Sequence, residues 1–240
     1  GKGIILGPRN FAGRAWQASP IAITVEGANI MTRSLMIFGQ GAILCHPWVM
    51  KEMKAVQIAD PNERLDAFDG ALFGHIGYAI SNAVRSFWFA ITGARFGKTP
   101  GDDYIRRYFR KLNRYSANLA LMADTSMLLL GGKLKFKESL SGRLGDVLSQ
   151  LYIISSMLKR YEDEGRQAED LPLLDYVMQD GFLTIERRLK EILDNFPNRP
   201  AAWLLKVFVL PFGVIRTGPR DATVRACARL ILEPSATRDR

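Results

Sequence analysis

Apolar residues recur every three or four positions over most of the chain, which is the period of an amphipathic helix. Almost no stretch alternates between apolar and polar residues with a period of two, the pattern of a half-buried strand. The sequence therefore predicts an all-α bundle of long antiparallel helices. The longest apolar series runs through Leu65, Phe68, Leu72, Ile76, Ile80, Val84 and Phe87.

Start and stop signals divide this pattern into segments. The stretch "DPNERL" (60–65) combines a capping Asp, a Pro suited to the first turn and a capping-box Glu, and predicts a helix to about Ile91. Asp102 or Asp103 begins the next helix, and Gly131 and Gly132 end it. Residues 1–25 predict a loop with at most one short helix. Further helices are expected at about 29–44, 49–58, 133–161, 173–195, 201–209 and 221–232.

The net charge of +9 is unevenly distributed. Residues 101–143 hold nine Lys/Arg against four Asp/Glu, residues 162–194 hold four against ten, and residues 199–240 hold eight against three. Basic surface attracts phosphates, acidic lipids or nucleic acid. No nucleic-acid-binding motif accompanies the charge, so we expect no nucleic-acid partner. Solvated helix faces are the alternative for each patch.

Cysteine and histidine are scarce. Two cysteines, Cys45 and Cys227, do not make a disulfide framework, and a reducing compartment is expected. With only His46 and His75 beside them, we expect no metal site.

The most apolar windows contain Arg85, Asp124 and Lys206, so none predicts a transmembrane helix. We expect Asp124 to be hydrogen-bonded or paired with an arginine inside the bundle. The segment 203–216 leaves two alternatives open: a helix that docks on the bundle, or an interfacial anchor with Trp203 and Phe208 on the membrane side.

Glu26, in "PIAITVEG" (20–27), follows a run of mostly apolar residues and precedes a glycine. Burial there would raise the pKa of a carboxyl group towards neutrality, which suits a general base. The other alternative is a carboxylate at a helix entrance, next to Asn29 as a helix cap.

The stretch "ITVEGANIMTRSLMIFGQGA" (23–42) resembles the C-terminal helical domain of acyl-CoA dehydrogenases, in which a catalytic glutamate precedes a glycine and a helix. The "GKG" at residues 1–3 resembles part of the Gly-Gly-x-Gly segment of the same family. The closer resemblance is to the bacterial FadE type. The stretch "SLSGRLGDVLSQLY" (139–152) also resembles the C-terminal extension of that type.

The resemblance implies a reaction and a site. It implies that Glu26 removes the α-proton of a fatty acyl-CoA while hydride passes to FAD, giving a trans-2-enoyl-CoA, the first step of fatty-acid β-oxidation. It places Glu26 and Gly27 at the substrate, and Gly1, Ala28 and Asn29 at the flavin. Ala28 departs from the threonine that is common in the family, and a hydroxyl contact to the cofactor is thereby lost.

The resemblance also implies a division of the chain. Residues 1–57 would be the end of the dehydrogenase C-terminal helical domain, truncated at its N-terminus, and residues 58–240 a helical extension. The chain begins without Met, which is typical of a piece of a longer polypeptide. We therefore expect the 240-residue piece alone to be inactive and to retain little FAD.

The partners expected from the resemblance are a fatty acyl-CoA, an electron-transfer acceptor protein and further copies of the chain. The expected location is the cytoplasm, with peripheral contact at the inner membrane left open. The alternative function is a non-enzymatic helical module that docks on a membrane or a partner. This alternative is based on the basic residues of 101–143 and on segment 203–216.

Overall fold

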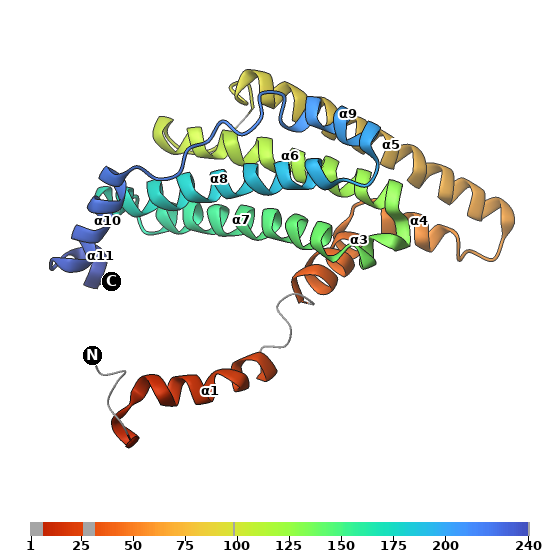
Figure 1. Ribbon diagram of the computed structural model, residues 1–240. Helices are drawn as coiled ribbons and strands as arrows, with labels where there is room; N and C mark the ends of the chain where they lie inside the picture. Colours follow the sequence, from red (N-terminus) through yellow and green to blue (C-terminus); the bar gives the residue numbers. More distant parts are fainter. Residues whose placement is uncertain (1–6, 26–31, 98, 240) are drawn as a thin grey trace.

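A computed structural model describes residues 7–25, 32–97 and 99–239, and every regular element within these ranges is helical (Figure 1). The predicted all-α class is confirmed. Four long helices, packed side by side, form the body of the domain: α5 (Pro61–Thr92), α6 (Asp103–Leu130), α7 (Glu138–Asp163) and α8 (Leu171–Asn195).

Shorter elements precede and connect these helices. The described residues begin with the 3₁₀ turn η2 (Gly7–Arg9) and helix α1 (Phe11–Val25), and the π-helix η3 (Thr32–Gln40) follows the undescribed residues 26–31. Then follow α3 (Gly41–Cys45) and α4 (Val49–Ala55). The 3₁₀ turns η4 (Gly131–Phe136) and η5 (Ala168–Asp170) precede α7 and α8, and the chain ends with α9 (Arg199–Val209), α10 (Asp221–Leu232) and α11 (Ala236–Asp239).

The predicted caps fix the ends of the two longest helices. The Asp60 carboxylate accepts hydrogen bonds from the N–H groups of Asn62 (3.0 Å) and Glu63 (2.8 Å), which satisfies donors that have no partner within the helix. Asp102 does the same at the start of α6. α5 ends at Gly93, whose φ of 62° is a left-handed conformation that glycine adopts without strain.

The N-terminal segment differs from its prediction. α1 spans 15 residues where the sequence favoured a loop with one short helix. The Asn10 side chain accepts a hydrogen bond from the N–H of Gly13 at 2.7 Å and so caps the helix, a signal that the Gly- and Pro-rich composition concealed. The side chains of Phe11, Trp16 and Ile21 are exposed, and Figure 1 shows α1 apart from the four long helices.

The core lies along the contact between α7 and α8 and continues onto α6. Its members are fully buried aliphatic and aromatic side chains, which remove apolar surface from water at about 25 cal/mol per Å². From α7 and α8 these include Leu144, Val147, Ile154, Leu158, Leu174, Met178, Ile185 and Leu189, and from α6 they include Tyr115 and Met122.

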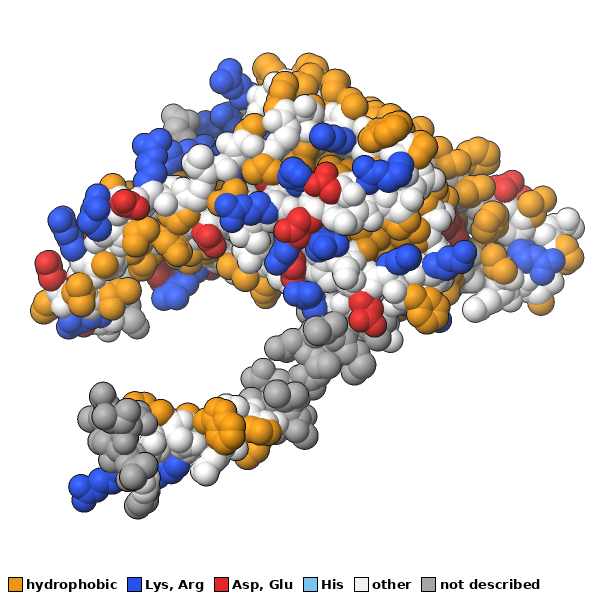
Figure 2. Space-filling view, viewed as in Figure 1, with side chains coloured by type: hydrophobic (Ala, Val, Ile, Leu, Met, Phe, Trp, Pro, Cys, Tyr) orange, Lys and Arg blue, Asp and Glu red, His pale blue; other side chains and the backbone are white. Residues whose placement is uncertain are grey.

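α5 packs on α6 with a face of small residues. The buried side chains of α5 are Ala71, Asn82, Ser86 and Ala90. Most of the large apolar residues whose spacing predicted this helix are instead exposed, for example Ile80 and Val84 at 59% each, and Phe68 and Leu72 are half-buried. Figure 2 shows hydrophobic side chains gathered along the edge that α5 and α9 form, where Trp88, Trp203 and Leu204 are also exposed. The period of the apolar residues identified the helix and not the face that it buries.

Candidate functional site

The residues that the sequence assigned to catalysis and cofactor binding lie outside the described residues. Glu26, Gly27, Ala28 and Asn29 fall in 26–31, and Gly1 falls in 1–6. The elements on either side of the motif are described: α1 ends at Val25 and η3 begins at Thr32.

η3 packs closely against α7. An added Cβ at Gly145 would lie 2.9 Å from the Arg33 carbonyl oxygen, and one at Gly142 would lie 2.9 Å from the Arg33 guanidinium. The two glycines therefore make room for the backbone and the side chain of a single residue. The Ser34 hydroxyl donates a hydrogen bond to the Glu138 carbonyl oxygen (3.3 Å), and Phe38 is buried in the core.

Ion pairs border this contact. Asp146 forms ion pairs with Arg33 at 3.1 Å and with Arg188 of α8 at 2.9 Å, so one carboxylate joins three elements. Glu191 accepts from Arg188 (2.8 Å) and Arg143 (3.2 Å), and the Arg188 hydrogen bond is the main cause that lowers the pKa of this carboxyl group. Because these side chains are partly exposed, the ion pairs contribute little to the stability of the η3 contact. We infer that they orient η3 on α7.

A second cluster joins α4, α5 and α6 and contains both histidines of the chain. His46 Nε2 lies 2.6 Å from Asp124 Oδ1, and His75 Nδ1 lies 2.8 Å from Glu52 Oε1. His75 Nε2 is 3.7 Å from the same oxygen of Asp124. The side chains of His46 and Asp124 are each 7% exposed, so this pair forms the buried part of the cluster, and His75 and Glu52 are partly exposed. The expected hydrogen bond of Asp124 is present, with a histidine as its partner.

The protonation of His46 follows from its other nitrogen. Nδ1 accepts the backbone N–H groups of Trp48 (3.2 Å) and Val49 (3.1 Å), which begin α4. The proton of the neutral ring is therefore on Nε2, and Nε2 donates to Asp124.

The two histidines and Asp124 also form a set of potential metal ligands whose donor atoms lie within 4.8 Å of one another. Metal binding at His46 Nε2 would require the ring proton to move to Nδ1, and the two backbone N–H groups would lose their acceptor. The geometry thus favours a hydrogen-bonded cluster that attaches the α3–α4 corner to α5 and α6. Sequence reasoning missed it because 78 residues separate His46 from Asp124.

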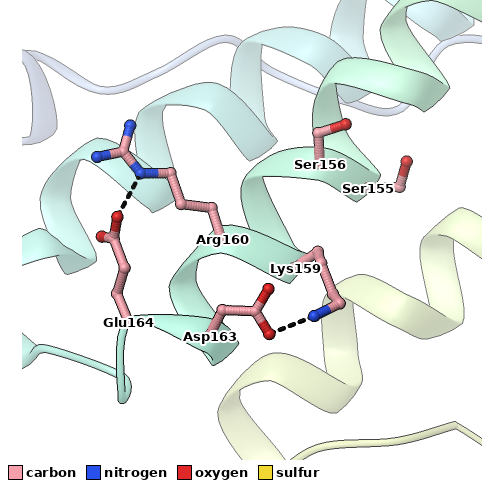
Figure 3. A pocket seen from close by; sticks show the side chains of 6 residues that line it. All are labelled: Ser155, Ser156, Lys159, Arg160, Asp163 and Glu164. Atoms are coloured by element: carbon pink, nitrogen blue, oxygen red, sulfur yellow. Dashed lines mark hydrogen bonds and ion pairs between the residues drawn. The ribbon is translucent and has the colours of Figure 1, made fainter.

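One surface depression lies at the end of α7 (Figure 3). Its lining comes from this helix and its C-cap residue Glu164, and includes Ser155 and Ser156, with the ion pairs Lys159–Asp163 and Arg160–Glu164. Each pair joins residues four positions apart on an exposed helix face. With a lining from one helix and no histidine, the depression has no arrangement for nucleophilic catalysis.

The comparison with known families agrees with this architecture. The family described as acyl-CoA dehydrogenase, C-terminal, bacterial type matches residues 43–240. The chain therefore belongs to this family, which is the one that the motif at residues 23–42 predicted. No solved structure matches the chain.

We expect Asp124→Ala to destabilise the domain, because the Nε2–H of His46 would be left buried without its acceptor. A loss of about 2 kcal/mol is expected for such a group. In a chain of this length it corresponds to a melting temperature lower by about 4–8 °C. Circular dichroism on heating measures the change.

Asp163→Ala is the matched control, because Asp163 is exposed and pairs only with Lys159 among the described residues. An equal effect of the two substitutions would contradict a structural role for the buried cluster.

Proposed function

We propose that the chain is the C-terminal part of a flavin-dependent acyl-CoA dehydrogenase, and that Glu26 removes the α-proton of a fatty acyl-CoA. The observation that carries the proposal is the position of the "VEGAN" motif (25–29) directly before η3, which docks on a domain of the acyl-CoA dehydrogenase family. The product would be a trans-2-enoyl-CoA.

The chemistry requires a base and a hydride acceptor. A glutamate placed within hydrogen-bond reach of the α-carbon proton supplies the base. Bound FAD would supply the hydride acceptor. Gly27 would leave space for the substrate, and Gly1, Ala28 and Asn29 would contact the flavin. A fatty acyl-CoA, an electron-transfer acceptor protein, a cytoplasmic location and assembly with further copies of the chain belong to the same proposal.

The proposed division of the chain at residue 57 would give the extension a role. Residues 58–240 include α7, whose Gly142 and Gly145 receive Arg33 only a few positions after the motif. A segment is positioned most accurately when rigid elements fix its ends. We therefore infer that the extension holds the C-terminal end of the Glu26 segment in place.

Replacing the base tests the assignment. In the full-length protein, Glu26→Gln should reduce kcat by about 10²–10⁴-fold, the usual contribution of a general base. The assay is turnover of palmitoyl-CoA with an artificial electron acceptor, after flavin absorbance has shown equal FAD content. Glu63→Gln, at an exposed position in the first turn of α5, is the matched control. Near-wild-type turnover of Glu26→Gln would refute the role of Glu26 as base.

The role of the extension makes a separate prediction. Gly145→Ala places a methyl group against the Arg33 backbone, so η3 must shift. Because small displacements of a reacting group are costly, kcat in the full-length protein should fall by about tenfold or more. Gly132→Ala is the control, since no atom lies within 4 Å of an added Cβ there. Unchanged kcat at equal FAD content would contradict the positioning role.

A second candidate function, docking on a membrane, is favoured by the exposed apolar face of α9. Ala202, Leu205 and Val209 pack inward, and the outer face exposes Trp203, Leu204, Val207 and the cation Lys206. Phe208, expected on the membrane side, instead packs edge-to-face on Phe87 of α5 at 5.9 Å. Within the described ranges, no helix has both the length and the apolar character needed to cross a bilayer. Contact would thus be peripheral.

We expect the full-length protein to sediment with vesicles that contain anionic phosphatidylglycerol, and to be released as salt screens the charges. Trp203→Ser should reduce the bound fraction, because the indole ring is a favourable interfacial anchor. Trp16→Ser, at an exposed tryptophan on α1, is the matched control. No sedimentation at low salt would exclude this second function.

A further inference from the structure

A cavity lies between α6, α8 and the segment that links α9 to α10. Its volume is about 360 Å³. The linking segment runs beside α6 and α8 (Figure 1), and its backbone is attached by Glu186, which accepts the N–H groups of Ile215 (2.9 Å) and Arg216 (2.8 Å). The polar side chains that line the cavity are Lys111, Gln179, Arg216, Thr217, Arg220 and Thr223, beside Tyr108.

Two of the three cations of this cavity, Lys111 and Arg220, have no ion-pair partner among the described residues, whereas Arg216 pairs with Glu186. The Lys111 amine lies over the rings of Tyr108 and Phe182, 5.3 and 5.5 Å from their centres, and no described residue accepts a hydrogen bond from it. Arg220 likewise has no acceptor within the described part of the chain. Arg216 donates a hydrogen bond from Nε to the Tyr115 hydroxyl (3.3 Å) and forms an ion pair with Glu186 at 3.7 Å.

The nearest carboxylates are occupied by other donors. Asp175 Oδ1 accepts from the hydroxyls of Tyr104 (2.6 Å) and Tyr108 and from Arg107 (3.3 Å). Glu186, fully buried, is held by the Tyr115 hydroxyl at 2.6 Å and by the two backbone N–H groups at the linking segment. These carboxylates order the walls of the cavity and leave Lys111 and Arg220 available to a ligand, with Arg216 beside them in its ion pair with Glu186.

The electrostatics of Lys111 agree with this arrangement. Burial, followed by the neighbouring charges of Arg216 and Arg107, lowers the pKa of the Lys111 amine to about 8, although Asp175 and Glu186 oppose the shift. A cation whose charge is disfavoured by its surroundings gains most from an incoming anion, because the anion relieves both the burial and the repulsion.

We propose that this cavity binds a phosphate group, with Lys111, Arg216 and Arg220 as its cationic ligands. A phosphate monoester has several acceptor oxygens and close to two negative charges at neutral pH, which suits three cations with the hydroxyls of Thr217 and Thr223 beside them. The phosphate belongs either to a soluble metabolite or to a lipid headgroup. The site involves none of residues 1–31, so it is independent of the role of Glu26.

Titration calorimetry of the full-length protein with inorganic phosphate, at constant ionic strength, tests the proposal. Saturable binding is expected, weakened about tenfold or more by Lys111→Gln and by Arg220→Gln, since each removes a charge-assisted hydrogen bond. Lys159→Gln, at an exposed lysine of α7, should leave the affinity unchanged. Absence of saturable binding, or equal binding by all variants, would overturn the proposal. Arg220 is exposed, so its variant keeps the test decisive if Lys111→Gln does not fold.

A footprinting experiment places the ligand. Acetic anhydride acetylates unprotonated amines, and mass spectrometry quantifies each lysine. Phosphate should slow acetylation of Lys111 and leave Lys159 unaffected; equal rates at Lys111 with and without phosphate would overturn the assignment. Vesicles of phosphatidylcholine with and without phosphatidic acid distinguish the sources. Binding that depends on phosphatidic acid and is lost in Lys111→Gln identifies a headgroup, and phosphate binding without it identifies a soluble ligand.

Discussion

The domain depends on the apolar contact between α7 and α8. Leu144, Val147, Ile154 and Leu158 meet Leu174, Met178, Ile185 and Leu189 without solvent exposure, and this contact fixes two further surfaces. On α7 it presents Gly142 and Gly145 to η3, and on α8 it presents Asp175 and Glu186 to α6 and the linking segment. A shift of these helices relative to each other would disturb both the Arg33 contact and the cationic cavity, because each uses side chains rigidly attached to this core.

Local signals predicted the elements well, since capping is a property of a few neighbouring residues. Asp60 and Asp102 begin helices as their spacing indicated, and α10 has the bounds 221–232 that were expected. α1 was missed because Asn10 caps a helix within a Gly- and Pro-rich stretch. The buried face of α5 was also not predictable, because helical period shows that apolar residues share a face and does not show what covers it.

The candidate sites differ in what the sequence could provide. Glu26 came from a contiguous motif, and the family match at residues 43–240 supports the relationship without describing the geometry of that motif. The His46–Asp124 pair and the cavity at Lys111 join residues that are far apart in the sequence, so no local sequence pattern predicted them. The single indication was Asp124 itself, a carboxylate on an apolar helix that required a partner.

Part of the uneven charge of the chain is paired inside the fold. The basic residues 101–143 lie mainly on α6, η4 and the start of α7, and the acidic residues 162–194 lie mainly on η5 and α8. Arg107 of the first stretch pairs with Asp175 of the second, and Arg143 pairs with Glu191. The basic stretch is thus a weaker argument for a membrane surface than its composition indicated, and the exposed face of α9 carries that alternative. The same pairing leaves Lys111 without a carboxylate, because Asp175 and Glu186 already hold hydroxyls, Arg107 and backbone N–H groups. A partly buried cation that has other cations beside it and no carboxylate partner is costly unless an anion joins it, and this physical constraint connects the charge pattern to the phosphate site.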